Sequence, residues 1–427
     1  MLGVWPIGPH RSPSSQENSI CAGRDLPAWL VRCCVAGLLL FGIFRLWGSG
    51  MLSDEQHHFR QVLAFAAGDW SLLPSLTTFP TWHFLLSLPL RALDQPTLDV
   101  VRIGNLAAAA TALAAFAALS RELVPAATGW RTLQLAALPL FLPYAPLVYT
   151  DIPAIAPSLL CLLMALKGRH GRAGLWGLLA VLLRQTSIVV LLAAACIAWI
   201  ERPVPREGHS QSRRLRSGSQ IALAYLPTLI VFILFVGWNG GVSVGEQEMH
   251  RVGTLHLGNV TLLFALLPLL FLPAAVPAWR VAQATSKKRV GLWTAVLVGG
   301  MLLAFSWSND HPYNQLEFQF FLHNQLALWA SADWLHRSAV GLLAASGVGL
   351  IFLWRPQRRS WAAVLLVLSL PLLGVALVEP RYLLLPIIVL QAGRPPLGER
   401  SEGLLFLLWM ICSGVLLEGM ATGLFFP

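Results

Sequence analysis

The chain has 427 residues, of which 56% are hydrophobic and only 12% are Asp, Glu, Lys or Arg. A soluble globular domain carries about 25% charged residues, so this composition excludes a soluble enzyme, a coiled coil and a disordered chain. The net charge of +10 does not indicate a nucleic-acid partner, because the basic residues gather in short loops between apolar runs. The sequence therefore predicts an all-α, polytopic membrane protein whose surroundings are the lipid bilayer.

Residues 1–25 are polar and contain Pro and Ser, without the apolar core of a signal peptide, so we expect a disordered N-terminal tail. The remaining residues, 26–427, are expected to form a single membrane domain. Its apolar runs, beginning with Ala28–Trp47, correspond to about 11 to 13 transmembrane helices. The six cysteines lie mostly inside these runs without CxxC spacing, which indicates neither a disulfide framework nor a zinc site.

A long polar segment, residues 48–99, follows the first apolar run. Within it, the apolar stretch Thr81–Leu90 has about ten residues, where a membrane span requires about 20. We therefore expect one large extracytoplasmic loop that carries a helix lying in the membrane interface. Acidic residues outnumber basic ones in this loop, which fits the non-cytoplasmic side.

Four short loops rich in Lys and Arg set the orientation of the spans, because such loops remain on the cytoplasmic side. These loops are residues 167–172, 201–219, 280–289 and 354–360. Threading the chain between them places the other loops on the opposite face. Ionisable residues beside membrane spans are costly unless they have a partner or a function. Because most of the acidic and histidine side chains gather on that opposite face, we expect any active site to be extracytoplasmic.

The first external loop carries carboxylates and histidines suited to acid–base chemistry. If Ser53 caps a helix, Asp54 and His58 share one face of it at positions i and i+4. The functional interpretation is that Asp54 or Glu55 is a general base at the membrane surface. The structural alternative is that the two acids only stabilise a helix N-terminus. A zinc site formed by Asp54, His57 and His58 is disfavoured because no metal-binding motif accompanies them, so we expect no metal and no cofactor.

Other external loops carry polar residues that have two interpretations each. Asp151 precedes an apolar run, where it either stabilises a helix start or faces the site. Arg184 interrupts an apolar hairpin, where it either snorkels to the surface or binds an anion. Glu379 and Arg381 flank a proline, and a local ion pair is the alternative to substrate binding. Trp238 begins a turn marked by an asparagine and two glycines.

Several motifs occur in a defined order between residues 50 and 390. They are Asp54-Glu55 with His58, Thr77-Thr78-Phe79-Pro80, Arg102 with Asn105, Tyr149-Thr150-Asp151, Leu183-Arg184-Gln185-Thr186, Trp238-Asn239-Gly240-Gly241 with Gly245 and His250, His311-Pro312-Tyr313, and Glu379 with Arg381-Tyr382. This ordered set resembles the dolichyl-phosphate-glucose-dependent α-1,2-glucosyltransferases of N-glycan precursor synthesis, members of the GT-C glycosyltransferase superfamily. The chain departs from that family at Asn314–Phe320, where the usual Asp-Asn-Arg-His-Tyr stretch is missing. This departure concerns the acceptor and the sugar more than the fold.

The resemblance implies a GT-C-like fold and a hexosyltransferase working on the lumenal or periplasmic face. Its donor would be a polyprenyl- or dolichyl-phosphate sugar, with glucose transferred in α-1,2 linkage to a lipid-linked glycan or similar acceptor. The acidic pair Asp54-Glu55 would hold the base, and Arg184 and Arg381 would neutralise the lipid phosphate without a metal. The other substrate-binding candidates are His58, Asp151, Gln185, Trp238, Asn239, His250, His311 and Glu379.

The expected location is the endoplasmic reticulum membrane in a eukaryote or the inner membrane in a bacterium. Two alternative functions remain open at this point. A transporter or flippase of a lipid-linked or small polar substrate is expected to show inverted halves with charges near the bilayer midplane, and no such symmetry is visible. A non-catalytic membrane scaffold gives no reason to gather carboxylates and arginines on one face.

Overall fold

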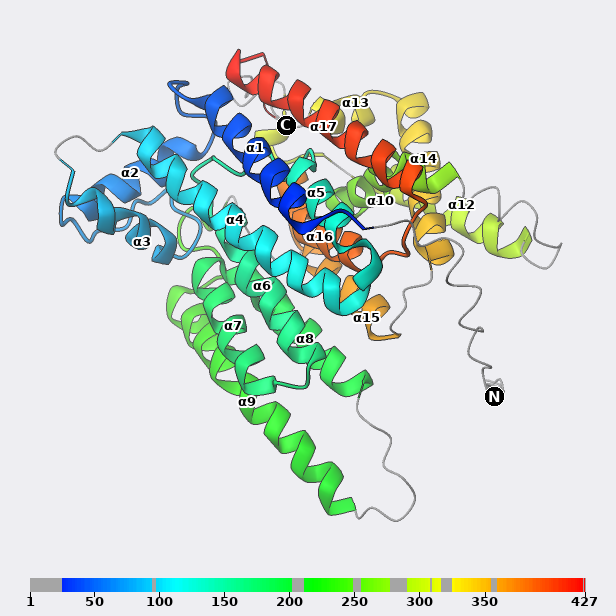
Figure 1. Cartoon of the computed structure of the whole chain (residues 1–427), viewed down its shortest axis with the longest axis horizontal. Coiled ribbons are helices and arrows are strands. Elements are labelled where there is room, and N and C mark those ends of the chain that lie inside the picture. The colour runs from blue at the N-terminus through cyan, green and yellow to red at the C-terminus, as the bar shows by residue number, and fades with distance from the viewer. Residues whose placement is uncertain are drawn as a thin grey trace.

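The computed structural model describes residues 25–93, 97–201, 211–248, 255–276, 290–307, 309–315, 325–354, 359–424 and 426. Every regular element within these ranges is a helix, so the all-α class predicted from the composition is confirmed (Figure 1). The expected disordered tail lies outside the described residues except for Asp25. The Asp25 carboxylate accepts hydrogen bonds from the backbone N–H groups of Gly129 and Trp130, at the start of α5 (Thr128–Ala137).

Twelve apolar helices of the described chain account for the membrane-spanning character. Five are long and apolar enough to cross a bilayer, namely α1 (Ala28–Leu46), α4 (Leu98–Leu123), the Gly218–Asn239 part of α9 (Gln211–Asn239), α14 (Trp334–Trp354) and α17 (Glu399–Ala421). Seven are shorter, namely α6 (Asp151–Leu166), α7 (His170–Leu183), α8 (Ile188–Ile200), α10 (Gly258–Leu270), α12 (Val290–Ser306), α15 (Arg359–Ser369) and α16 (Leu384–Gly393). Five helices of the described chain therefore have the length of a membrane span, and the count of 11 to 13 spans stays a prediction; the chain is a multi-pass membrane protein.

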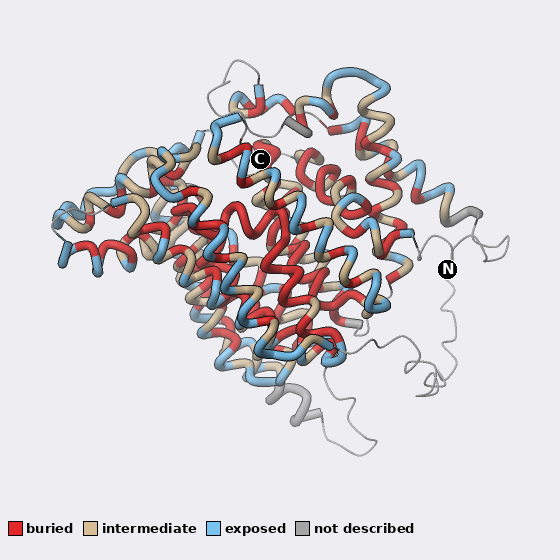
Figure 2. Tube along the Cα trace, turned by 45° about the horizontal axis from the view of Figure 1, so that its top comes forward, coloured by how far each residue is buried: buried red, intermediate tan, exposed pale blue. Residues whose placement is uncertain are grey.

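The helices form two groups joined by a central layer (Figure 1). In one group α6 packs against α7 and α8, and α7 packs against α9. In the other, α14 packs against α10 and α12. Between the groups, α4, α5, α16 and α17 share one continuous apolar core with α6 and α8. Buried residues concentrate at this centre (Figure 2), which therefore holds the ends of the helices in fixed positions.

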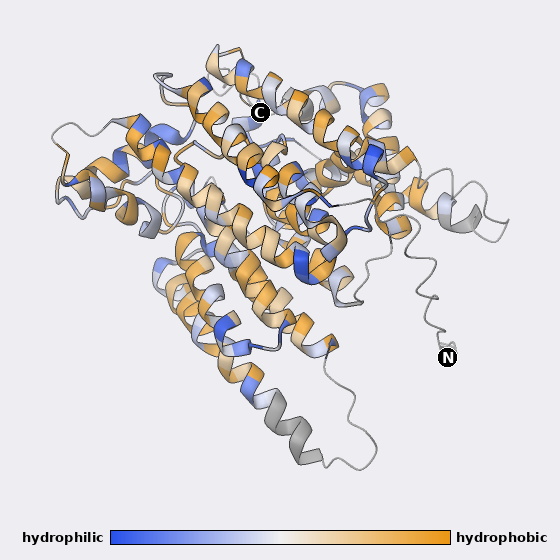
Figure 3. Ribbon diagram, viewed as in Figure 1, coloured by the Kyte–Doolittle hydropathy of each residue, from blue (hydrophilic) through white to orange (hydrophobic). Residues whose placement is uncertain are grey.

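The outer faces of the peripheral helices are apolar (Figure 3). On α9, for example, Leu223, Ile233 and Leu234 are exposed although they are strongly hydrophobic. Exposed tryptophans stand near helix ends, with Trp47 just after α1 and Trp238 near the end of α9. Apolar flanks bounded by tryptophans are typical of helices that face lipid and end at the headgroup level.

The segment after α1 forms a separate small unit beside the main core. It contains α2 (Glu55–Ala66) and α3 (Thr81–Leu90), which pack against each other and project from the edge of the molecule (Figure 1). The helix predicted at residues 81–90 is thus present and too short to span a bilayer. A second apolar cluster, which includes Val62 and Leu86, holds this hairpin against α4. The hairpin therefore brings the start of α2 close to the central layer.

A buried polar network ties α5 to α16 and α17. It consists of Arg131, Gln134, Gln391, Arg394 and Glu402, and we call it the closed network. All three side-chain nitrogens of Arg394 are bonded, with partners that include Gln391 at 2.8 Å, Gln134 at 2.9 Å and Glu402 at 3.0 Å. Arg131 donates to two backbone carbonyls at the end of α16. Hydrogen bonding of this kind around Arg394 and Glu402 offsets the cost of burying their charges, while Nε of Arg131 has no hydrogen-bond partner in the described residues.

Candidate active site

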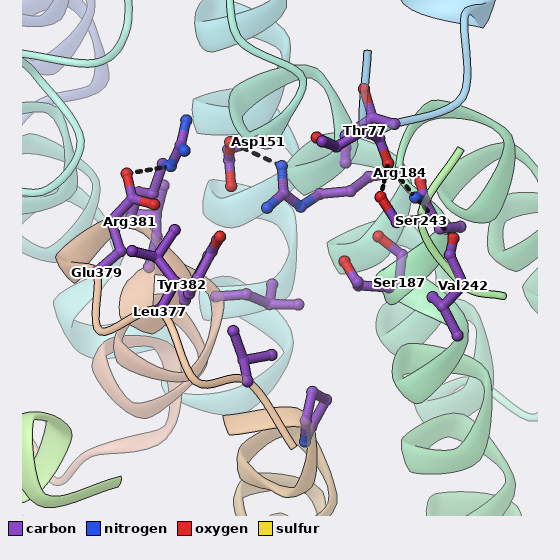
Figure 4. A pocket seen from close by; sticks show the side chains of 18 of the residues that line it. Thr77, Asp151, Arg184, Ser187, Val242, Ser243, Leu377, Glu379, Arg381 and Tyr382 are labelled. Atoms are coloured by element: carbon purple, nitrogen blue, oxygen red, sulfur yellow. Dashed lines mark hydrogen bonds and ion pairs between the residues drawn. The ribbon is translucent and has the colours of Figure 1, made fainter. Parts of the chain in front are cut away.

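Loops that the charge pattern places on one face of the membrane meet around a cavity of about 230 Å³ (Figure 4). Its polar wall comes from the start of α2, the loop before α3, the start of α6, the turn after α7 and the loop after α9. A 3₁₀ turn, η7 (Pro380–Leu383), completes this wall. The lining also includes apolar side chains, namely those of Ala154, Ile155, Val189, Leu368, Leu372, Val375, Leu377, Leu384 and Leu385. The cavity is therefore lined by both charged and hydrophobic side chains.

Arg381 joins two carboxylates at the polar wall. Its Nη2 donates to Asp54 Oδ2 at 2.6 Å, and its Nε pairs with Glu379. The guanidinium also lies over the Tyr149 ring, 4.8 Å from the ring centroid. Burial raises the pKa of Glu379 to about 7, although Arg381 acts in the opposite direction. The Asp54 side chain is 34% exposed and the Glu379 side chain 3%, so Asp54 is the carboxylate open to the cavity.

A second ion pair joins Arg184 to Asp151. The Nη1 of Arg184 lies 2.8 Å from Asp151 Oδ2 and also donates to the Thr150 hydroxyl at 3.2 Å. Arg184 is extended, with φ −154° and ψ 111°, because α7 ends just before it and η2 (Gln185–Ser187) begins just after it. This break turns its side chain into the cavity (Figure 4). Among the described residues, Nε and Nη2 of Arg184 make no hydrogen bond, so these two donors are available to an anion.

Tyr382 stands between the two ion pairs. Its ring lies 5.9 Å from the Arg184 guanidinium and 5.8 Å from that of Arg381. Figure 4 shows Tyr382 beside Arg381 and Glu379, across the cavity from the residues that follow α7. The site thus presents two cations and three carboxylates around one aromatic ring.

Glu55 does not line the cavity. Its two oxygens accept from Arg102 at 3.0 and 2.7 Å and from the backbone N–H groups of Val148 and Leu52, each at 3.1 Å. The side chain has no exposed surface. Consecutive residues of a helix point about 100° apart, so Asp54 and Glu55 face different surroundings. Glu55 ties α2 to α4, while Asp54 faces the cavity.

The helix that carries these acids begins one residue later than the sequence predicted. Asp54, rather than Ser53, occupies the N-cap position of α2, and its side chain makes no capping hydrogen bond. Ser53 has φ +51°, a left-handed conformation that is unfavourable for a residue with a side chain. Glu246, which also lines the cavity, has φ +45°. Among the described non-glycine residues these are the two at positive φ, and such strain concentrates at functional sites.

His58 lies one turn after Asp54 and lines the cavity, as the i, i+4 spacing predicts. Its Nδ1 is 2.8 Å from Nε2 of His83, a fully buried residue of α3, and the two rings are stacked with centroids 5.0 Å apart. Burial lowers the pKa of both histidines, that of His83 to about 4. Both rings are therefore neutral at pH 7. His83 was not among the predicted site residues.

Gln185 lines the cavity, but its side-chain amide is engaged with the backbone of two loops. Its Nε2 donates to the carbonyls of Thr77 at 2.7 Å and Val242 at 3.0 Å, and its Oε1 accepts from the N–H of Phe79 at 3.3 Å. The Val244 N–H donates to the same Thr77 carbonyl. The amide thus acts as a clamp that joins the loop before α3 to the loop after α9.

The loop after α9 is shaped by Asn239 and Gly245. The amide of Asn239 donates to the carbonyls of Gly241 and Ser243 and thereby fixes the turn, and Asn239 is not part of the cavity wall. Gly245 lies so close to the Pro74 carbonyl that a Cβ atom would collide with it. A glycine is therefore required where the two loops touch.

The structure places the three other predicted binding residues away from the cavity or outside the described residues. Trp238 is 86% exposed and does not line the cavity. His250 lies outside the described residues. The His311 side chain accepts from the Tyr313 N–H, while Tyr313 itself lines the cavity and its hydroxyl is 3.5 Å from Glu246. Tyr313 belongs to the His-Pro-Tyr motif, so the motif contributes to the site through its last residue.

Metal ligands were also sought in the described part of the chain. No group of three or more His, Cys, Asp or Glu side chains there is placed to hold a metal ion. The arginines around the cavity are Arg184 and Arg381, and a bidentate guanidinium suits an anionic phosphate oxygen pair.

Comparison with known proteins gives one family and several relatives. The model of the DIE2/ALG10 family matches residues 49–220 and 209–392, a stretch that includes every residue of the cavity wall. The Dol-P-Glc:Glc(2)Man(9)GlcNAc(2)-PP-Dol alpha-1,2-glucosyltransferase of Candida glabrata is 23% identical over 71% of this chain and 65% of its own length. The protein of the same name from Mus musculus is 25% identical over 62% of this chain and 63% of its own. The chain thus spans slightly under two thirds of the length of these relatives.

A solved structure also aligns with most of the chain. The apo structure of ArnT from Cupriavidus metallidurans is similar over 92% of this chain and 77% of its own, with 16% identity and a TM-score of 0.41.

Proposed function

The chain belongs to the DIE2/ALG10 family, and from that premise we propose that it transfers glucose from a dolichyl- or polyprenyl-phosphate glucose to a lipid-linked glycan. The linkage formed is α-1,2, as in the names of the Candida and mouse relatives. The reaction takes place on the extracytoplasmic face, where the charge pattern places the loops that line the cavity.

The observation that carries this proposal is a cavity lined by both charged and hydrophobic side chains. A polyprenyl-phosphate sugar has an anionic, hydroxyl-rich head and a long hydrocarbon chain. Arg184, Arg381 and the three carboxylates suit the head, and the apolar lining residues of α6, α8 and α16 suit the first part of the chain. A carrier of small polar solutes has no need of hydrophobic lining residues beside its charged groups, so the geometry favours a lipid-linked substrate over such a solute.

Asp54 is the residue we assign as general base. A sugar hydroxyl has a high pKa and becomes a nucleophile when a carboxylate within hydrogen-bond reach accepts its proton. Asp54 is the most exposed carboxylate in the two ion pairs, and Arg381 fixes its orientation. As the acceptor oxygen forms its bond to C1 of glucose, the bond from C1 to the phosphate oxygen breaks, and the proton of the hydroxyl moves to Asp54.

Arg184 is the residue we assign to the leaving phosphate. Two of its nitrogens are free of hydrogen bonds in the described residues, whereas Arg381 is shared between two carboxylates. Negative charge grows on the phosphate oxygen as the bond to C1 breaks, so a fixed guanidinium stabilises the transition state more than the ground state. Glu55, saturated by Arg102 and two backbone N–H groups, holds α2 in place and takes no part in proton transfer.

The test is transfer by the purified protein in lipid nanodiscs, using radiolabelled dolichyl-phosphate glucose and a panel of lipid-linked acceptors. The panel includes acceptors outside N-glycan synthesis because the chain departs from the family motif at Asn314–Phe320. We expect labelled product whose new linkage is α-1,2, formed about 10²- to 10⁴-fold more slowly with Asp54→Asn. Movement of intact lipid-linked substrate across vesicle membranes without transfer would instead establish the flippase alternative.

A further inference from the structure

One hydroxyl of the cavity lining is buried and has no partner within the described chain. It belongs to Thr78, which lines the cavity and is 8% exposed. Its Oγ1 makes no hydrogen bond to any described residue. The other buried lining atoms in this condition belong to charged side chains that take part in ion pairs, namely Asp151, Glu379 and Arg381. Among the described lining residues, Thr78 is therefore the one uncharged side chain that is buried without a partner.

The other buried threonines of the described chain show that such a hydroxyl is an exception. Each of them has a hydrogen bond: Thr128, Thr132, Thr228 and Thr261 donate to backbone carbonyls, and Thr150 accepts from Arg184. A buried hydroxyl without a partner destabilises the fold, because it has lost its bonds to water and has gained none in return. Because Thr78 borders a cavity, a molecule bound there can supply the missing partner.

The backbone on both sides of Thr78 is fixed by Gln185. The Gln185 amide donates to the Thr77 carbonyl at 2.7 Å and accepts from the Phe79 N–H at 3.3 Å. The loop is therefore not free to carry the Thr78 hydroxyl to a partner elsewhere in the protein. Gln185 follows Arg184 directly in the chain. The turn after α7 thus both holds Thr78 and directs the Arg184 side chain into the cavity (Figure 4).

Thr78 belongs to the part of the cavity where Arg184 is anchored. Figure 4 shows the preceding residue, Thr77, across the cavity from Arg381. Asp54 is bonded to Arg381, so the proposed general base lies on that other side. Arg184, which keeps two nitrogens without hydrogen bonds in the described residues, is the residue assigned to the leaving phosphate. A hydroxyl bonds more strongly to an anionic oxygen than to a neutral one, so a phosphate is the partner that this side favours.

We infer that Thr78 is a further binding residue, whose hydroxyl donates a hydrogen bond to a phosphate oxygen of the lipid-linked sugar beside the Arg184 guanidinium. The identity of the ligand as a lipid phosphate rests on the proposed function, whereas the unpartnered hydroxyl does not. In the empty protein this hydroxyl destabilises the fold. Binding of the donor gives it a partner, so that the cost is removed and the affinity for the donor increases.

The first test is binding of dolichyl phosphate and of dolichyl-phosphate glucose to the full-length protein in lipid nanodiscs. Thr78→Val keeps the shape of the side chain and removes the hydroxyl. It should weaken binding of both lipids by a similar factor, roughly tenfold to a hundredfold, the range of one hydrogen bond to a charged group. Thr78→Ser keeps the hydroxyl and should retain most of the affinity.

Two results of this binding experiment would overturn the inference. One is an unchanged affinity for dolichyl phosphate in Thr78→Val. The other is a loss of affinity confined to dolichyl-phosphate glucose, which would assign the hydroxyl to the sugar instead of the phosphate.

The second test is thermal unfolding without ligand. Thr78→Val should not lower the melting temperature, because no hydrogen bond within the described protein is lost. The matched control is Thr228→Val, at a buried threonine of α9 whose hydroxyl donates to the Gly174 carbonyl of α7 at 3.2 Å, outside the cavity lining. This control should lower the melting temperature and leave the affinity for both lipids unchanged. An equal loss of melting temperature in Thr78→Val would show that its hydroxyl has a partner within the protein, and would overturn the inference.

Neither test requires sugar transfer, so failure of the inference is distinct from failure of the proposed function. If the unmodified protein binds both lipids as expected but forms no product, the proposed function is wrong and the role of Thr78 stands. If the unmodified protein binds neither lipid, the proposed donor is wrong and the inference is overturned with it.

Discussion

The closed network and the cavity wall use the same chemical groups in opposite ways. In the closed network, Arg394 has all three nitrogens bonded, and its partner Glu402 is 2% exposed. At the cavity wall, Arg184 has one nitrogen engaged and Asp54 is 34% exposed. An ion pair whose donors are saturated can only hold helices together, whereas one with free donors beside a cavity can bind a ligand. Residue type alone does not separate the two.

Two consecutive residues, Asp54 and Glu55, belong to the two different kinds of ion pair. Glu55 and Arg102 form a saturated pair of the structural kind, although Asp54 belongs to the cavity. The substitutions that follow test this division, beginning with the largest expected effect.

Asp54→Asn should lower the turnover number about 10²- to 10⁴-fold, because a positioned general base contributes that much. The variant keeps the shape of the side chain, so donor binding and the melting temperature should change little. Glu55→Gln is the neighbouring control. It weakens the bonds to Arg102, so it should lower the melting temperature while the turnover of the folded protein changes little. If Glu55→Gln abolishes turnover in a folded protein while Asp54→Asn does not, the base is Glu55. If neither substitution matters, Asp151 becomes the next candidate.

Glu402→Ala should destabilise the fold by about 3–5 kcal/mol, because it leaves the buried guanidinium of Arg394 without its counter-ion. Thermal and chemical unfolding in micelles measure this loss. Turnover per folded molecule should remain normal, since the closed network does not line the cavity. Asp151→Asn, the corresponding change at the cavity wall, should show the reverse pattern. A stability loss in Asp151→Asn as large as that in Glu402→Ala would remove the distinction between the two regions.

Arg184→Lys should weaken donor binding by about 1–3 kcal/mol, because lysine keeps the charge but loses the bidentate guanidinium. Binding of a fluorescent polyprenyl-phosphate glucose analogue measures the change. Arg394→Lys is the matched substitution in the closed network, and it should lower stability without changing donor affinity. Unchanged donor affinity in Arg184→Lys would make Arg184 a structural residue.

Glu379 should make stability depend on pH near neutrality. Its folded-state pKa, about 7, lies above the ordinary value of 4.5 because of burial. The folded state therefore favours the protonated form, and this contribution to stability is lost as pH rises through about 7. We expect the melting temperature to fall by about a few degrees on raising the pH from about 6 to about 8. Glu379→Gln should flatten that dependence; an equal slope in the variant would assign it to another group.

Trp238→Ala should have the smallest effect. The sequence suggested a binding role for Trp238, but the side chain is 86% exposed at the end of α9. Exposed substitutions usually change free energies by less than about 0.5 kcal/mol, which corresponds to about a twofold change in turnover. A larger loss would mean that the loop after α9 moves over the cavity during the reaction.

The arrangement of the loops was the part of the site that the sequence predicted well. The distribution of Lys and Arg assigned Asp151, Arg184 and Glu379 to one face, and the structure brings all three to one cavity. The helical period likewise placed His58 on the face of Asp54. The resemblance to the family, drawn from the external motifs, is confirmed by the family match. The grouping of the loops and the spacing of His58 could be predicted because membrane orientation and helix periodicity are both local properties of the chain, whereas the side of the membrane and the roles of these residues stay predictions.

The sequence could not predict which groups the individual side chains contact. Nothing local distinguishes Gln185, whose amide serves two loops, from a glutamine that binds sugar. His83 is a histidine in a short apolar helix, and its partner, the ring of His58, comes from another helix. Tyr313 and His311 belong to one motif, and only the three-dimensional turn decides which side chain enters the cavity. Tertiary contacts between distant residues determine these roles.

The clamp formed by Gln185 has a consequence for how the cavity opens. The Gln185 amide bonds to the backbone of both the loop before α3 and the loop after α9. These two loops therefore cannot move away from Gln185 one at a time. Amide hydrogens of Phe79 and Val244 should therefore exchange with solvent at a common rate, as members of one cooperative unit. Admission of the proposed lipid-linked acceptor then becomes a single opening event rather than a series of small ones, and its frequency sets an upper limit on how often that acceptor can enter.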